Sequence, residues 1–255
     1  MFSHCKLVTL MLALTLHGQV YTGEIFGGHE AVPHSRPHMV LLEQHMGEDR
    51  IKHCGGFLLN EDFVMTAAHC QAKSYKVLLG LHDVHNSKEI QHVFVEQAFP
   101  HKEYDEKELK NDIMLLKLKS KAQFNKNVKP IALAGKDDAS LPKSCIVSGW
   151  GRSDKVNRHM TPKLMEVNVT LIDNDWCTTE KLYCSKGENG PAEGDSGGPL
   201  VCEDGKAYGV VSASGILNSN GAQIYCFTKI PDYRNWIDGI IGHIGNGPNA
   251  SNHNI

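Results

Sequence analysis

The stretch "GPAEGDSGGPLVC", residues 190–202, sets one serine, Ser196, between an aspartate and two glycines. Glycine adopts backbone conformations that other residues avoid, and it lets neighbouring backbone approach closely. A simple glycine-rich turn would explain this composition. So would a nucleophile whose surrounding N–H groups must point at a reaction product. The choice depends on whether the rest of the chain supplies a base for the serine.

Two other stretches offer partners for this serine. A serine hydroxyl becomes a good nucleophile when a base accepts its proton and a third group orients that base. His69 in "TAAHC" ends an apolar run, where a Cys54–Cys70 disulfide would hold its loop. Asp112 in "NDIMLL" begins another apolar run, where a carboxylate needs a donor such as an imidazole. Each stretch alone has a structural explanation, but the three in this order are specific.

The pattern along the chain predicts an all-β fold. From Ile25 onward, short β-rich runs are separated by Gly, Pro, Asn and Asp, which is typical of a barrel or a sandwich. Residues 129–143 form a linker between two halves. Apolar residues at helical spacing after Pro231 predict a helix over about 231–244. A polar, flexible tail follows at 245–255.

The three motifs together resemble the chymotrypsin-type serine proteases, and the resemblance runs from Ile25 to about Ile244. It implies a protease domain over 25–243, made of two six-stranded antiparallel β-barrels with the active site between them. The barrels are expected at about 25–135 and 136–230.

The resemblance also implies a role for each residue in the motifs. His69 is the general base, Asp112 orients it and Ser196 is the nucleophile. The backbone N–H groups of Gly194 and Ser196 form the oxyanion hole. The sequence therefore predicts hydrolysis of peptide bonds through an acyl-enzyme.

The first 24 residues predict secretion and processing. Lys6 precedes a ten-residue apolar run, which is too short to span a bilayer but fits a signal peptide over 1–22. A buried N-terminal helix is the alternative. Removal of the dipeptide 23–24 by a dipeptidyl peptidase would free the ammonium of Ile25, which by resemblance pairs with Asp195. We therefore expect the precursor to be nearly inactive.

Eight cysteines fit a secreted protein, where thiols are oxidised to disulfides. Cys5 leaves with the signal peptide, so seven remain and one lacks a partner. By resemblance the disulfides are Cys54–Cys70, Cys145–Cys202 and Cys177–Cys184, which leaves Cys226. Two sequons, at Asn168 and Asn249, predict N-glycosylation.

The start of the domain, "IFGGHEAVPHSRPHMVLL" at 25–42, resembles the granzyme, chymase and cathepsin G branch. The base of the specificity pocket is expected at Gly190, where no acidic residue is present to select Lys or Arg. Tyr225 could fill this pocket or hydrogen-bond its occupant. We expect a small or modest apolar residue before the scissile bond. The predicted substrate-binding residues are Gly190, Glu193, Ser212, Ala213, Ser214 and Tyr225.

These observations predict a monomeric serine endopeptidase, secreted directly or stored in cytoplasmic granules. Its expected partners are protein or peptide substrates, the activating dipeptidyl peptidase, serpin-type inhibitors and granule proteoglycan. The formal net charge of −3 argues against general affinity for nucleic acid or anionic membranes. No cofactor or metal is implied.

Three alternatives remain on the sequence alone. An inactive homologue acting as a binding or antimicrobial protein would keep the scaffold, and a digestive protease would keep the chemistry. A metal site is conceivable because histidine and aspartate are good ligands, but the spacing fits no known site. The residues in question are His82, Asp83, His85 and His92.

Overall fold

The computed structural model describes Ile25 and residues 27–48, 50–86, 88–138, 141–152, 159–216 and 223–245. The predicted signal peptide, the activation dipeptide, the sequon at Asn249 and, apart from Gly245, the predicted tail lie outside these residues.

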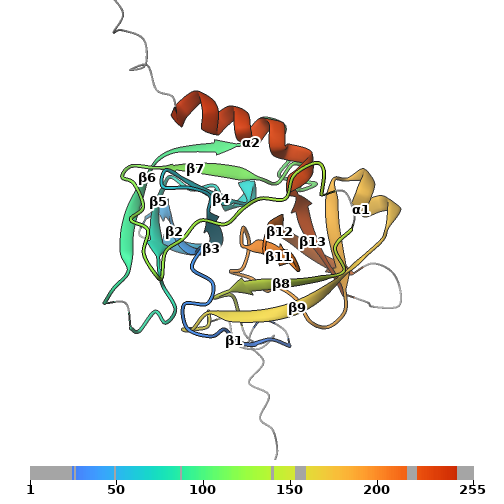
Figure 1. The fold of residues 1–255 in the computed structure, drawn as a ribbon, viewed down its shortest axis with the longest axis horizontal. Coiled ribbons are helices and arrows are strands. Elements are labelled where there is room, and N and C mark those ends of the chain that lie inside the picture. Colours follow the sequence, from blue (N-terminus) through green and yellow to red (C-terminus); the bar gives the residue numbers. More distant parts are fainter. Residues whose placement is uncertain are drawn as a thin grey trace, which may run out of the picture.

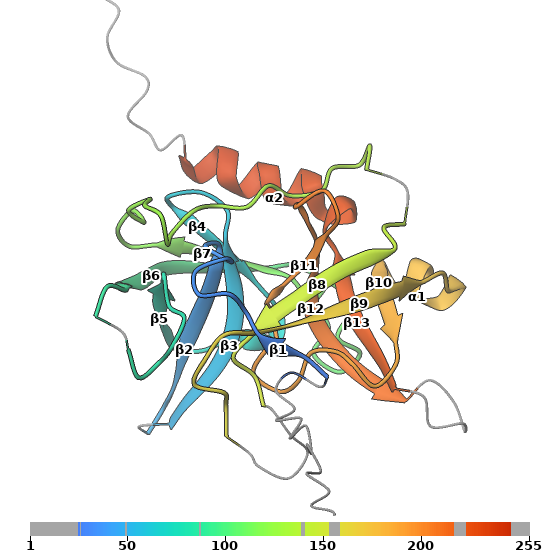
Figure 2. The same ribbon diagram turned by 60° about the horizontal axis from the view of Figure 1, so that its bottom comes forward.

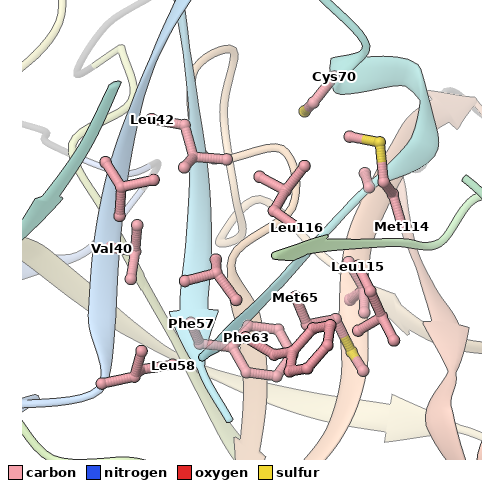
Figure 3. Packing of buried hydrophobic residues seen from close by; sticks show 14 of the residues in the cluster. Val40, Leu42, Phe57, Leu58, Phe63, Met65, Cys70, Met114, Leu115 and Leu116 are labelled. Atoms are coloured by element: carbon pink, nitrogen blue, oxygen red, sulfur yellow. The ribbon is translucent and has the colours of Figure 1, made fainter. Parts of the chain in front are cut away.

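The first half of the chain closes into a six-stranded antiparallel barrel, coloured blue to green in Figure 1. Its interior is filled by apolar side chains, among which Phe57, Phe63 and Leu116 pack together in Figure 3. Burial of this apolar surface is the main force that holds the strands together. In the order of pairing around the barrel, the strands are β2 (Met39–Gly47), β3 (Arg50–Leu58), β4 (Phe63–Thr66), β7 (Met114–Leu118), β6 (Gln91–Pro100) and β5 (Ser74–Leu79).

The second half forms another six-stranded antiparallel barrel beside the first (Figure 1). Alternate residues of its strand at 165–172 face the core, as the twofold period of a strand requires. Val167 and Val169 are buried, whereas Asn168 and Thr170 are exposed. In order of pairing, the strands are β8 (Ser144–Gly149), β9 (Met165–Ile172), β10 (Leu182–Lys186), β13 (Gln223–Lys229), β12 (Ala207–Ile216) and β11 (Pro199–Cys202), which returns to β8.

Two shorter elements attach to the second barrel. β1 (His29–Glu30) extends the edge of β9, as Figure 2 shows, and α1 (Asp175–Thr179) lies between β9 and β10 in the chain. The fold is therefore all-β with two six-stranded barrels, as the resemblance implied.

The C-terminal helix returns from the second barrel to the first. α2 (Ile230–Gly245) places Tyr233 and Ile237 in the apolar cluster of the first barrel, and it crosses the top of the molecule in Figure 1. The Tyr233 hydroxyl donates a hydrogen bond to Asn111 Oδ1 at 3.0 Å, so the helix braces the loop before β7. Over the described ranges, no helix has both the length and the apolar character that membrane crossing requires.

A separate apolar cluster joins the two barrels. The fully buried Trp150, which follows β8, packs in it with Met39 and Leu41 of β2 and with Leu164. The Trp150 indole N–H also donates to the His82 carbonyl at 3.1 Å. These contacts fix the relative position of the barrels, and therefore of the loops that meet between them.

Candidate active site

Strand pairing brings His69 and Asp112 to the same end of the first barrel. β4 and β7 run antiparallel, with Thr66 opposite Met114. His69 lies three residues after Thr66, in the short 3-10 helix η1 (Ala68–Cys70), and Asp112 lies two residues before Met114. The antiparallel register therefore places the two side chains next to one another, although they are 43 residues apart in the chain.

The two residues are joined by two hydrogen bonds. Asp112 Oδ2 lies 2.7 Å from His69 Nδ1, and Asp112 Oδ1 accepts from the backbone N–H of His69 at 2.8 Å. An ionised carboxylate only accepts hydrogen bonds, so it requires that Nδ1 carry a hydrogen. The second ring nitrogen, Nε2, is then left with a lone pair that can accept a proton.

Two further side chains support the buried Asp112, which is fully inaccessible to solvent. The Ser212 hydroxyl donates to Asp112 Oδ2 at 2.5 Å, and the Thr228 hydroxyl donates to the Asp112 backbone carbonyl at 2.9 Å. Both come from the second barrel, so the carboxylate is held by both halves of the chain. The sequence analysis placed Ser212 only in the pocket and did not include Thr228, because nothing in their spacing marks a partner for Asp112.

The loop that carries Ser196 is pressed against the first barrel. The Ser196 carbonyl accepts from the Gly55 N–H at 2.7 Å and lies 3.8 Å from Cys70 Sγ. Gly197 has a φ of +83°, and a Cβ there would lie 2.1 Å from the Thr66 hydroxyl oxygen. Any side chain at Gly197 would therefore push the serine loop away from β4.

The Ser196 carbonyl thus contacts the residue that follows His69. No hydrogen bond joins the Ser196 hydroxyl to the His69 imidazole in the part of the chain that the structure describes. Catalytic hydrogen bonds of this kind often tighten only when substrate binds. The structure brings the base and the predicted nucleophile to one seam between the barrels.

The backbone at and before Ser196 carries the two N–H groups predicted to form the oxyanion hole. Gly194 has a φ of +101°, and the preceding Glu193 carbonyl accepts from the Arg152 N–H at 2.8 Å. In a trans peptide the carbonyl and the next N–H point in opposite directions, so the Gly194 N–H faces away from Arg152. Among the described residues, neither this N–H nor that of Ser196 donates to a protein group. Both are therefore available to an external oxygen.

Asp195 is a second fully buried carboxylate, with fewer donors. It accepts from the backbone N–H groups of Gly151 at 2.7 Å and Ala192 at 2.8 Å. Burial raises the pKa of Asp195 to about 6, and the two hydrogen bonds only partly offset this rise. Ile25 is also fully buried, in the core of the second barrel. Its nitrogen is an amide in the unprocessed chain, so it has no charge to pair with Asp195.

The expected specificity pocket is filled by Tyr225. Its side chain is 2 % exposed, and a Cβ added to Gly190 would lie 2.4 Å from its ring. The Tyr225 hydroxyl donates to the Glu188 carbonyl at 3.2 Å. The Tyr225 ring therefore occupies the space beside Gly190.

Two adjoining clefts lie over β12 and β13. Their volumes are about 280 and 500 Å³, and both are lined by Trp176, Ala213 and Cys226. Ser212 lines the smaller cleft and also bonds to Asp112, so this cleft begins beside the base. Trp176 on α1 is 53 % exposed. The sequence analysis did not include Trp176, although an aromatic residue beside Cys177 was a usable signal.

The structure has the three disulfides that the resemblance implied, namely Cys54–Cys70, Cys145–Cys202 and Cys177–Cys184. Cys226 is a free, buried thiol. The first disulfide joins β3 to η1 and so holds the His69 loop against the strand whose Gly55 binds the Ser196 carbonyl.

The histidine-rich loop that was weighed as a metal site has other partners. His82 is buried, and its Nε2 lies 3.0 Å from Glu30 Oε1. The backbone N–H of His85 donates to Asp83 at 2.9 Å, which is an ordinary turn contact. His92 is exposed on β6.

The two-barrel architecture, with an aspartate–histidine pair and a serine in a glycine-rich loop at the seam, is that of the chymotrypsin-like serine proteases. A sequence model of the family described as "Trypsin" matches residues 25–237. The chain belongs to this family.

Relatives of the chain include granzymes and a chymase. Granzyme B of Rattus norvegicus is 38% identical over 245 residues, covering 91% of this chain and 97% of that protein. Chymase of Mus musculus is 38% identical over 250 residues, covering 92% and 98%. The solved structure titled "Structure of GrC" superimposes with a TM-score of 0.74 and 33% identity, covering 85% of this chain and 99% of that chain. The chain is therefore a trypsin-family protein similar to granzymes and chymases.

Proposed function

We propose that the protein is a serine endopeptidase that cleaves peptide bonds through an acyl-enzyme at Ser196. The observation that carries this proposal is the buried Asp112, which binds the His69 imidazole through Oδ2 and the His69 backbone N–H through Oδ1. A buried carboxylate that accepts from one imidazole nitrogen leaves the other nitrogen free to act as a base, which is what nucleophilic catalysis by a serine requires.

The proposed reaction follows from the donors and acceptors at the seam. The Ser196 hydroxyl attacks the substrate carbonyl carbon while His69 Nε2 takes its proton. The negative oxygen that forms is stabilised by the N–H groups of Gly194 and Ser196. His69 then gives the proton to the leaving amine. Water next attacks the acyl-enzyme while His69 takes its proton, and the acid is released as the proton returns to Ser196.

Labelling with a fluorophosphonate, which reacts with activated serines, tests the proposal. After removal of residues 1–24, we expect label on Ser196, no label in Ser196→Ala and full label in Ser74→Ala. Ser74 is an exposed serine at the start of β5, outside the three motifs, and serves as the matched control. A processed, folded protein that takes up no label would contradict the proposal and favour the inactive binding protein.

For specificity, we propose a small or modest apolar residue before the scissile bond. The Tyr225 ring leaves no room for a long side chain to reach Gly190, and position 190 itself carries no carboxylate to attract Lys or Arg. The clefts lined by Trp176 and Ala213 offer apolar surface to residues further from the bond. Cleavage of a peptide library tests this, and strong preference for Lys or Arg would contradict it.

Processing and location are part of the same proposal. Cleavage before Ile25 would create an ammonium for the buried Asp195, whose raised pKa indicates that it lacks a cation in the unprocessed chain. A secretory route is suggested by segment 1–22, with storage on granule proteoglycan through histidines that gain charge in acid. Heparin affinity that stays unchanged between about pH 7 and pH 5 would count against this storage.

A further inference from the structure

The unpaired Cys226 lies against an existing disulfide. Its Sγ is 4.0 Å from Cys184 Sγ, and Cys184 is already bonded to Cys177. The contact follows from strand pairing, because Cys184 on β10 and Cys226 on β13 are directly opposite each other in an antiparallel pair. Three sulfur atoms are therefore gathered in one buried cluster.

The same molecule already has a disulfide between directly opposed cysteines. Cys145 on β8 and Cys202 on β11 are register partners in an antiparallel pair, and they are bonded. The strand relationship of Cys184 and Cys226 is of the same kind. A bridge between them therefore needs no new arrangement of the sheet.

We propose that Cys226 and Cys184 form an alternative disulfide by exchange within the folded chain. The Cys226 thiolate attacks Cys184 Sγ, the Cys184–Cys226 bond forms, and the Cys177–Cys184 bond breaks. Cys177 leaves as a thiolate and takes up the proton that Cys226 lost. The numbers of disulfides and thiols are unchanged, so no external oxidant or reductant is consumed.

The surroundings of Cys226 make this exchange slow at neutral pH. Burial raises the pKa of Cys226 to about 11, and only the thiolate attacks. The titratable groups that share its cleft are Glu108, Lys110 and Glu180. Lys110 pairs with both glutamates, at 2.9 and 3.3 Å, so no unpaired cation is directed at the thiol. We therefore expect the rate to rise with pH.

Exchange would remove the disulfide between α1 and β10. Cys177 lies on α1 and Cys184 on β10, and without their bond the two elements stay covalently joined only through the short turn at 180–181. Next to Cys177, Trp176 lines both clefts opposite Ala213 and Cys226. If the proposed protease function holds, the two disulfide forms differ in the shape of these clefts and so in their preference for apolar residues away from the scissile bond.

The exchange is tested in the folded Ser196→Ala protein, which cannot digest itself, so the result is independent of the proposed protease activity. Samples held at about pH 9 and about pH 7 are quenched in acid, denatured and alkylated, and the labelled cysteine is identified by peptide mapping. We expect the label to move from Cys226 to Cys177 with time, faster at the higher pH, together with a Cys184–Cys226 linked peptide. A label that stays on Cys226 alone, at both pH values and at all times, overturns the proposal.

A pair of variants tests the geometry separately. Cys177→Ser leaves Cys184 and Cys226 as opposed thiols, and oxidised glutathione should join them. Cys184→Ser leaves Cys177 and Cys226, which should stay reduced under the same conditions. Both variants are first shown to be folded by circular dichroism. Two persistent thiols in Cys177→Ser, or equal bridging in both variants, overturns the proposal, and if Cys177→Ser does not fold the mapping experiment still decides.

Discussion

The catalytic cluster and the pocket meet at two adjacent residues of β12, Ser212 and Ala213, but are built on different principles. In the catalytic cluster, His69, Asp112 and Ser212, the buried Asp112 carboxylate accepts hydrogen bonds from specific donors on the other two residues. In the pocket group, Gly190, Ala213 and Tyr225, side-chain volume decides which substrate residues fit. The large Tyr225 ring fills the space at Gly190, whereas the small Ala213 leaves a cleft open. The catalytic cluster depends on specific hydrogen-bond partners, whereas the shape of the pocket changes whenever a substitution changes the size of a side chain. Reaction type and substrate preference are therefore encoded separately.

Asp112→Asn should cause the largest loss and so mark the catalytic side of the comparison. The amide NH2 group would face the donors from His69, which would favour the wrong tautomer of the imidazole. We expect kcat to fall by about 10⁴-fold in the processed protein. Asp137→Asn, at an exposed aspartate that belongs to neither group, should leave kcat unchanged. A loss of less than about tenfold for Asp112→Asn would mean that His69 needs no orienting carboxylate.

Asp195 tests what happens when a buried carboxylate has too few donors. Burial raises its pKa to about 6 in the folded, unprocessed chain, against 3.8 for the free group. The folded state therefore holds the proton more tightly, and its contribution to stability falls as pH rises from about 4 to about 6. The expected loss, relative to Asp195→Asn, is roughly 3 kcal/mol.

Urea unfolding of the unprocessed Ser196→Ala chain across this pH range measures the loss. The Asp195→Asn variant in the same background is the control because it has no carboxyl to ionise. A stability difference between the two that is flat with pH would show that Asp195 has another partner. Processing should reduce the pH dependence, since the new ammonium at Ile25 would favour the ionised form.

The fold was accessible from the sequence because its signals are local. The β-rich runs, the turn residues and the apolar spacing after Pro231 all report on neighbours in the chain, and the structure has strands and α2 at those places. The disulfides followed from the resemblance. Alternate residues of β9 are buried and those between them, including Asn168, are exposed, as the twofold period of a strand requires.

The supporting residues of the site were not accessible in the same way. Ser212 and Thr228 reach Asp112 from about 100 and 116 positions away, and only the closure of both barrels brings them together. Whether Tyr225 points into the pocket or away from it depends on the register of β13 against β10 and β12. A motif marks the reacting groups, whereas volume in the pocket is a property of the packed structure.

Tyr225→Ala tests the pocket side of the comparison. Removing the ring opens space above Gly190, so the preferred residue before the scissile bond should change from small to large and apolar. We expect discrimination between alanine and phenylalanine substrates to change by about 10- to 100-fold, with kcat for the best substrate retained. Tyr208→Ala, another buried tyrosine of the second barrel, should lower stability by a similar amount without this change. An unchanged library profile for Tyr225→Ala would place the pocket elsewhere.

Ser212→Ala should give the smallest effect, because it stands on the border between the two groups. The substitution removes one of three donors to Asp112, but both hydrogen bonds from His69 remain. One lost bond corresponds to about a tenfold fall in kcat. Because the Ser212 hydroxyl is hydrogen-bonded to Asp112, KM should change less than kcat. Ser212→Thr, which keeps a hydroxyl, should recover most of the rate. A loss as large as that of Asp112→Asn would mean that the Asp112 carboxylate needs the hydroxyl from the second barrel to stay ionised. Reaction type and substrate preference would then not be encoded separately at Ser212.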